Sequence, residues 1–74
     1  MTLTLDKVQK NVSVVIKDIL DSDQTIRLME MGFCPGQSVK VLGKAPLGDP
    51  IIIKVNASTI MLRNSEASTV SVEE

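Results

Sequence analysis

Few residues of the kind that performs catalysis occur in this chain. It has 74 residues, no histidine and one cysteine, Cys34. Without histidine no Ser–His or Cys–His pair can form, and Cys34 stands beside Pro35 with no basic neighbour in sequence to activate its thiol. Neither a Gly-x-Gly-x-x-Gly nor a Gly-Lys-Ser/Thr phosphate-binding motif is present. We therefore expect a protein that is not an enzyme, with Cys34 as a small buried hydrophobic residue.

Metal ligands are equally sparse in the sequence. Cys34 has no second thiol or imidazole at a ligand spacing such as Cys-x-x-Cys. Carboxylates could hold a hard divalent cation, but Asp18, Asp21 and Asp23 fall at the end of a predicted strand and at a predicted helix start, where charge and capping account for them. Methionine thioethers suit soft cuprous ions better than harder divalent cations. The sequence therefore predicts no intrinsic high-affinity metal site and no cofactor.

Charge and aromatic content argue against two further binding classes. Eight Lys and Arg residues stand against nine Asp and Glu, so the formal net charge is −1 and no global field attracts nucleic acid or an anionic bilayer. Phe33 is the single aromatic residue, so a groove for polyproline or for stacked bases lacks its lining. The lysines are scattered, at positions 7, 10, 17, 40, 44 and 54. We expect no nucleic-acid binding; the alternative, a small nucleic-acid-binding barrel, would require a local basic face that the net charge of −1 conceals.

The apolar runs and the single cysteine bear on where the protein works. The longest uninterrupted apolar stretches, such as residues 14–16 and 51–53, are far too short to cross a bilayer. The N-terminus lacks the basic region followed by an apolar one that a signal peptide requires. An unpaired cysteine fits a reducing compartment. We expect a soluble cytoplasmic protein that meets a membrane only indirectly, through a partner.

Alternation of apolar and polar residues predicts five short strands. Their inward side chains are expected to be those of Val12, Val14 and Ile16, Val39 and Val41, Ile51, Ile53 and Val55, Ile60 and Leu62, and Val70 and Val72. The high proportion of β-branched residues, nine Val and seven Ile, favours strands over a helical bundle. Leu3, Leu5 and Val8 precede the first long strand, and we expect them to lie under the sheet as a turn or short strand.

One helix of about two turns is predicted over residues 24–31. Asp21, Ser22 and Asp23 are good N-cap residues before it, and Gly32 after it is a typical helix end. The segments 31–36 and 45–50 together hold three of the four Gly and all three Pro residues. These residues fix the backbone in turn conformations, so both segments are predicted to be tight connections.

The order and spacing of several short motifs resemble the ferrous iron transport protein A family, FeoA. The motifs are Arg27-Leu28, Met31-Gly32, Pro35-Gly36, the turn at 45–50 with its Pro-Leu-Gly-Asp-Pro sequence, Leu62-Arg63 and Glu66-Ala67. They extend over nearly the whole chain. Asn11 and Asn56 stand where family members often carry glycine, and asparagine is the non-glycine residue best suited to a left-handed turn. Cys34 also departs from the aliphatic residue or threonine that is commoner there.

The resemblance implies a fold and a role. The fold would be mostly β, a small SH3-like barrel of about five short strands with one short helix inserted after the first long strand, and residues 1–74 would form a single domain. The role would be that of a small cytosolic accessory protein of bacterial ferrous iron uptake. Its implied partner is the cytosolic, GTP-hydrolysing part of the FeoB transporter. The alternative is a regulatory module related to the SH3-like domain of iron-dependent repressors, which would need an attached DNA-binding portion.

A docking face is predicted from two parts of the chain. Leu47 lies between Pro46 and Gly48 at a loop tip, where a polar residue would serve a purely structural turn equally well. We expect Pro46, Leu47, Gly48 and Asp49, together with Arg27 and Glu30 on the helix, to contact the partner. Each has a structural alternative: Asp49 as the cap of a local turn, and Arg27 with Glu30 as a solvated helical face. Arg63 and Glu66, three residues apart, are expected to pair with each other.

Three apolar residues are predicted on strand faces that point away from the interior. They are Val15, Ile52 and Met61. We expect the helix face with Ile26 and Met29 to pack on them as a second small core, and a partner-docking patch is the alternative. An unpaired edge strand in a partly open barrel would also allow self-association.

Overall fold

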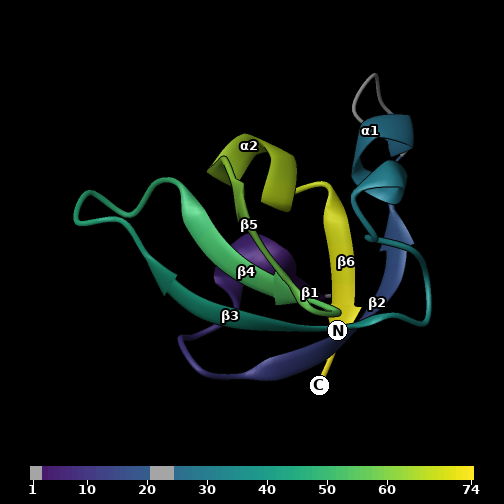
Figure 1. Cartoon of the computed structure of the whole chain (residues 1–74), viewed down its shortest axis with the longest axis horizontal. Coiled ribbons are helices and arrows are strands. Elements are labelled where there is room, and N and C mark those ends of the chain that lie inside the picture. The colour runs from purple at the N-terminus through teal and green to yellow at the C-terminus, as the bar shows by residue number, and fades with distance from the viewer. Residues whose placement is uncertain (1–2, 21–24) are drawn as a thin grey trace.

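The computed structural model describes residues 3–20 and 25–74, and it forms one antiparallel sheet with short helical segments (Figure 1). The elements in chain order are β1 (Leu3–Thr4), the 3-10 helix η1 (Leu5–Lys7), β2 (Ser13–Ile19), α1 (Thr25–Glu30), β3 (Ser38–Lys44), β4 (Ile51–Val55), β5 (Ser58–Leu62), α2 (Asn64–Ala67) and β6 (Val70–Glu73). The strands are ordered β1-β6-β2-β3-β4-β5 in the sheet, with β1 and β5 at its two edges. The mostly-β, SH3-like class predicted from the sequence is confirmed.

Each of the five predicted strands is present, and three further elements, β1, η1 and α2, accompany them and the predicted helix. The two-residue strand β1 pairs Leu3 with Val72 of β6, so the segment expected under the barrel adds a short edge strand. The helix α2 was not predicted. It occupies only four residues between β5 and β6, too short for an amphipathic period to be visible in the sequence.

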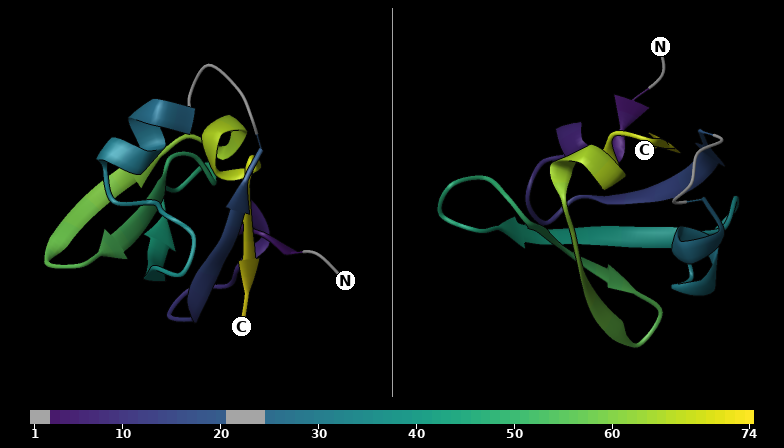
Figure 2. Two further views of the ribbon diagram at one scale, coloured as in Figure 1. Left: turned by 90° about the vertical axis from the view of Figure 1, so that its right-hand side faces the viewer. Right: turned by 90° about the horizontal axis from the view of Figure 1, so that it is seen from above.

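The core follows from the predicted alternation along the strands. Sixteen hydrophobic residues of the described chain are buried and form one cluster. The strand residues in it include Val14 and Ile16, Val39 and Val41, Ile51, Ile53 and Val55, Leu62, and Val70 and Val72. Leu5, Leu28 and Phe33 enter from η1, α1 and the segment after α1, and none of them is exposed. The sheet curls around one side (Figure 2), and these side chains form one cluster of buried residues.

Helix α1 covers less of the molecule than its sequence suggests. Its side chain Leu28 is fully buried, whereas Ile26 is 72% exposed and Met29 is 44% exposed. The expectation that Ile26 and Met29 pack on the outer strand residues is therefore wrong. The helix ends at Glu30, and a Cβ built at Gly32, two residues further on, would lie 3.0 Å from Cγ1 of the inward-facing Val55, so the end of α1 approaches the inner side of the sheet and leaves its outer side open.

The boundaries of α1 follow the expected signals where they can be compared. The predicted cap residues Asp21, Ser22 and Asp23, and residue 24, lie outside the described residues. At the other end, the Gly32 N–H donates to the carbonyl of Met29 at 3.1 Å, and Gly32 has a φ of +103°. That conformation favours glycine, so Gly32 stops the helix as expected, and α1 ends at Glu30, one residue before the predicted end.

The two asparagines at family glycine positions adopt the expected conformation. Asn11 has a φ of +68° and Asn56 a φ of +56°. Both lie in the left-handed region, which asparagine tolerates better than other residues with a side chain. The fold therefore keeps these turns without glycine.

The helical segments of the described chain run for six residues or fewer, too few to cross a bilayer.

Candidate partner-docking site

The loop between β3 and β4 presents Leu47 almost fully to solvent. Ala45 donates its N–H to the carbonyl of Pro50 at 3.0 Å, and Gly48 donates to the carbonyl of Ala45 at 2.7 Å. These bonds close the loop at its base and across its tip. Leu47, between them, is 96% exposed, the largest exposed fraction among the large hydrophobic residues of the described chain. The loop therefore holds an aliphatic side chain in water on a turn that its own hydrogen bonds close.

Asp49 ties this loop to α2. Its Oδ1 accepts the backbone N–H of Asn64, the first residue of α2, at 2.9 Å. The side chain of Asn64 in turn donates from Nδ2 to the carbonyl of Gly48 at 3.0 Å. Asp49 thus caps a helix 15 residues further along the chain, in addition to sitting in its own turn. The loop and α2 are held together at two points.

Glu66 ties α2 to α1. Its side chain is only 6% exposed, and its Oε1 accepts the backbone N–H of Arg63 at 3.1 Å. Its Oε2 accepts a charged hydrogen bond from Nη1 of Arg27. Arg63 and Glu66 therefore pair as expected, but through the backbone N–H of Arg63, and the cation that binds the carboxylate comes from Arg27, 39 residues away. Glu30, on the same helix as Arg27, is exposed.

Replacing Arg27 with alanine is expected to lower the free energy of unfolding by about 1 kcal/mol. The change removes the cation from a buried carboxylate, but the Arg27 side chain is 61% exposed and water screens much of the interaction. Urea denaturation followed by circular dichroism would measure the difference. The variant Arg63→Ala keeps the backbone N–H that Glu66 binds and serves as the control with little expected change. Equal losses in both variants would contradict the assignment of Arg27 as the partner.

The predicted docking residues occupy two separate places in the fold. Pro46, Leu47, Gly48 and Asp49 lie in the loop at the left of Figure 1, whereas α1, which carries Arg27 and Glu30, lies at the upper right. The view from above in Figure 2 keeps them at opposite ends of the molecule. Helix α2 lies between them in both views and is bonded to each through Asn64 and Glu66. A face that includes both parts must therefore be centred on α2.

Helix α2 and its two links were not predicted from the sequence. The signal that could have found the helix is Glu66 three residues after Arg63, the spacing at which an acidic side chain returns to the N–H of a helix cap residue. The links themselves depend on tertiary structure. Asn64 and Asp49, like Arg27 and Glu66, meet only after the sheet has curled.

Cys34 is exposed, so the expectation that it is buried is wrong. Phe33 takes the buried position in this turn. The N–H of Cys34 donates to the carbonyl of Gly32 at 3.0 Å, and the Cys34 side chain lies on the outside of the turn. The Cys34 thiol lies 3.7 Å from the carbonyl oxygen of Met29. Within residues 3–20 and 25–74, no three side chains of His, Cys, Asp or Glu gather in a way that could hold a metal ion.

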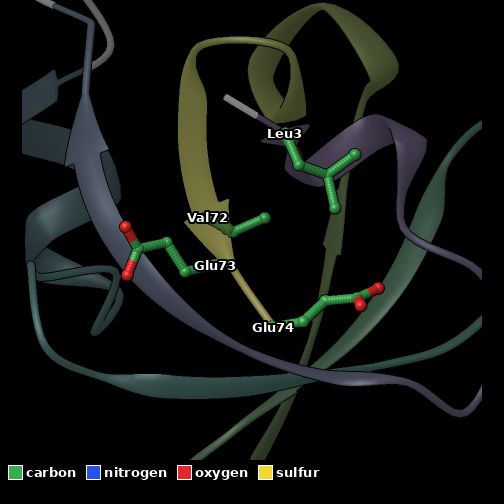
Figure 3. Close-up of a pocket in the computed structure, with 4 residues that line it drawn as sticks. All are labelled: Leu3, Val72, Glu73 and Glu74. Atoms are coloured by element: carbon green, nitrogen blue, oxygen red, sulfur yellow. The ribbon is translucent and has the colours of Figure 1, made fainter. Parts of the chain in front are cut away.

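One hollow in the described surface lies beside the chain ends. Leu3, Val72, Glu73 and Glu74 line it, and Figure 3 shows the Leu3 and Val72 side chains flanking the space. The Glu73 carboxylate is directed away from it, toward β2, where it lies 3.5 Å from the Lys17 ammonium group. The hollow thus lacks the converging polar groups of a small-molecule site.

Comparison with known proteins identifies the family to which this fold and sequence correspond. The model of the FeoA domain family matches residues 3–74. The chain belongs to the FeoA family. Among solved structures, iron(II) transport protein A from Clostridium thermocellum superposes with a TM-score of 0.90 at 35% identity, covering 96% of this chain and 44% of that one. FeoA from Stenotrophomonas maltophilia, an SH3 domain protein solved with zinc, gives 0.86 at 32% identity and covers 96% of this chain and 89% of that one.

A further relative joins FeoA to a transporter in one polypeptide. The Fe(2+) transport protein A/Fe(2+) transporter FeoB fusion protein of Porphyromonas gingivalis is 36% identical over 47 residues. The match covers 64% of this chain and 6% of the length of the fusion protein. The manganese regulator SloR also shares the fold of this FeoA chain, with a TM-score of 0.79, but at 19% identity the likeness is one of fold alone.

Proposed function

We propose that this FeoA chain is an accessory protein of bacterial ferrous iron uptake that works in the cytoplasm by binding the cytosolic, GTP-hydrolysing part of a FeoB-type transporter. The fusion relative supports the pairing, since in that protein FeoA and FeoB share one chain. Family membership supports a role in ferrous iron transport. On this proposal residues 1–74 act as one domain, and the protein contributes a surface rather than a catalytic group.

The observation that carries the proposal is the position of Leu47. It is 96% exposed on a loop closed by its own hydrogen bonds and fastened to α2 through Asp49. An ordered turn loses little conformational freedom when it binds, so an exposed aliphatic residue at its tip contributes efficiently to affinity. We propose that Pro46, Leu47, Gly48 and Asp49 form the primary contact, with Arg27 and Glu30 at the far end of a face centred on α2.

A nucleic-acid-binding role has less support. Phe33, the single aromatic residue of the sequence, is fully buried and has no face on which a base could stack.

Replacing Leu47 with aspartate is expected to weaken binding to the transporter's cytosolic domain at least about tenfold. The change puts a charge where an apolar contact is proposed, and it removes no contact from the core because Leu47 is outside it. Isothermal titration calorimetry with the purified cytosolic domain would measure the effect. The control Ala57→Asp adds the same charge to the exposed β4–β5 turn and should bind as the unmodified chain does. Unchanged affinity of Leu47→Asp would rule out this loop as the anchor.

A further inference from the structure

The outer side of β3, β4 and β5 carries two rows of residues that differ in character. The register places Lys40, Lys54 and Thr59 side by side across the three strands. The neighbouring row on the same face, two residues earlier along β4, places Gly43, Ile52 and Met61 side by side. Both rows face away from the core, since the strand neighbours Ile53 and Val55 are the buried ones. An apolar row therefore runs next to a basic one on an open surface.

Folding does not account for the basic row. Lys40 and Lys54 are exposed and directly opposite each other in the ladder, an arrangement that disfavours the sheet because the charges repel. The ion pairs found within residues 3–20 and 25–74 are Lys17 with Glu73 and Arg27 with Glu66, so neither lysine has an acidic partner there. The chain as a whole has a net charge of −1, so an acidic partner would need a local pair of positive charges such as this one.

Gly43 leaves a notch in the apolar row. Its φ lies outside the left-handed region, so the backbone does not require glycine at this position. A Cβ built there would meet just one neighbour within 4 Å, Cε of Lys10 at 3.9 Å. Lys10 thus brings a third cationic side chain to the edge of the notch. Ile52 is half-buried beside Gly43, and Met61 in the same row is 65% exposed.

We propose that this basic-apolar patch, made of Lys10, Lys40, Gly43, Ile52, Lys54 and Met61, binds an acidic segment of the protein partner, with an aliphatic side chain of that segment over Gly43. The inference rests on the proposed function and states the chemistry of the partner. The patch continues into the Leu47 loop, because β3 and β4 lead directly to the Ala45–Pro50 hydrogen bond at the base of that loop. One extended segment could therefore contact both.

A protein segment fits the patch better than nucleic acid or a bilayer. The apolar row consists of an isoleucine, a methionine and a glycine, and methionine adapts well to side chains of varied shape. No aromatic residue is available for base stacking, since Phe33 is buried. The net charge of −1 provides no long-range attraction to a polyanion, whereas a partner with a few acidic groups needs only the local lysines.

The variant Lys54→Glu tests the inference, with the transporter's cytosolic domain as the probe. We expect binding to weaken at least about tenfold and to depend less on salt concentration. The urea midpoint should not fall, because the introduced carboxylate would stand opposite Lys40 and replace repulsion by attraction. The control Lys17→Glu makes the same charge change on β2, away from the patch, and should leave the affinity unchanged.

The outcomes separate this inference from the function on which it rests. Unchanged affinity of Lys54→Glu, in a chain whose binding Leu47→Asp abolishes, would overturn the patch and leave the proposed function standing. If the unmodified chain does not bind the cytosolic domain, the proposed function fails and the inference fails with it. Shifts of the patch amides with a 20-nucleotide oligothymidine, or with phosphatidylglycerol vesicles, in place of the cytosolic domain would overturn it in favour of those ligands.

Discussion

Replacing Gly32 with alanine is expected to lower the free energy of unfolding by about 2–4 kcal/mol. Gly32 has a φ of +103°, a conformation that residues with a side chain rarely adopt. A Cβ at this position would also lie 3.0 Å from Cγ1 of Val55, a buried core residue whose side chain has little room to move. Small domains are typically stable by roughly 3–5 kcal/mol, so the variant should be close to unfolding at room temperature.

Two other glycines separate the backbone contribution from the steric one. Gly36 also has a positive φ, +91°, but a Cβ there would meet nothing within 4 Å, so Gly36→Ala should show the backbone cost alone, about 1–2 kcal/mol. Gly43→Ala meets neither obstacle and should change stability little. Urea denaturation of the three variants would give the order directly. A Gly32→Ala variant no less stable than Gly36→Ala would contradict the close approach of α1 to Val55.

Replacing Glu66 with alanine is expected to lower the free energy of unfolding by about 2–3 kcal/mol. The carboxylate is buried and accepts two hydrogen bonds, from the N–H of Arg63 and the guanidinium group of Arg27. Alanine would leave the backbone N–H of Arg63, the residue before α2, without its acceptor. It would also remove the hydrogen bond that links α2 to α1. The loss should exceed that of Arg27→Ala, because Glu66→Ala removes both hydrogen bonds and leaves the Arg63 N–H without its acceptor, whereas Arg27→Ala removes only one.

Glu66→Gln gives a matched control for this site. Glutamine keeps an oxygen that can accept from Arg63 but loses the charge that Arg27 binds, so its cost should be about 1 kcal/mol, near that of Arg27→Ala. Combining Glu66→Gln with Arg27→Ala should then cost little more than either change alone. Additive losses in the double variant would show that the two side chains do not interact.

Local patterns in the sequence predicted the sheet well because strand alternation and turn chemistry are local properties. Val14 and Ile16 are buried as their period of two requires, and Asn11 and Asn56 take up the left-handed turns expected of them. Helix α1 ends at Glu30, just before the turn at Gly32 that the sequence predicts to stop it. In each case the residue and its immediate neighbours determine the conformation.

Tertiary contacts decided the features that sequence patterns did not reveal. Arg27 is three residues from Glu30 in sequence, yet it binds Glu66, which the folded chain brings alongside it. Ile26 and Met29 have the spacing of a packed helix face, but the six-residue helix buries Leu28 and approaches the inner side of the sheet. Cys34 is small and apolar enough for the core, but Phe33 occupies that place. The opposition of Lys40 and Lys54 required the register of β3 on β4.

The most direct test of the account is a titration of the isotopically labelled chain with the cytosolic domain of a FeoB-type transporter, with and without GTP, followed by the NMR signal of each backbone amide. The account predicts shifts in the loop around Leu47, in α2 and along the outer side of β3 to β5. It predicts none along the outer side of β2, where Val15 is exposed. Signals that stay unchanged at saturating concentrations, or shifts confined to the surface around Val15, would contradict the claim that this FeoA chain binds the transporter through the loop.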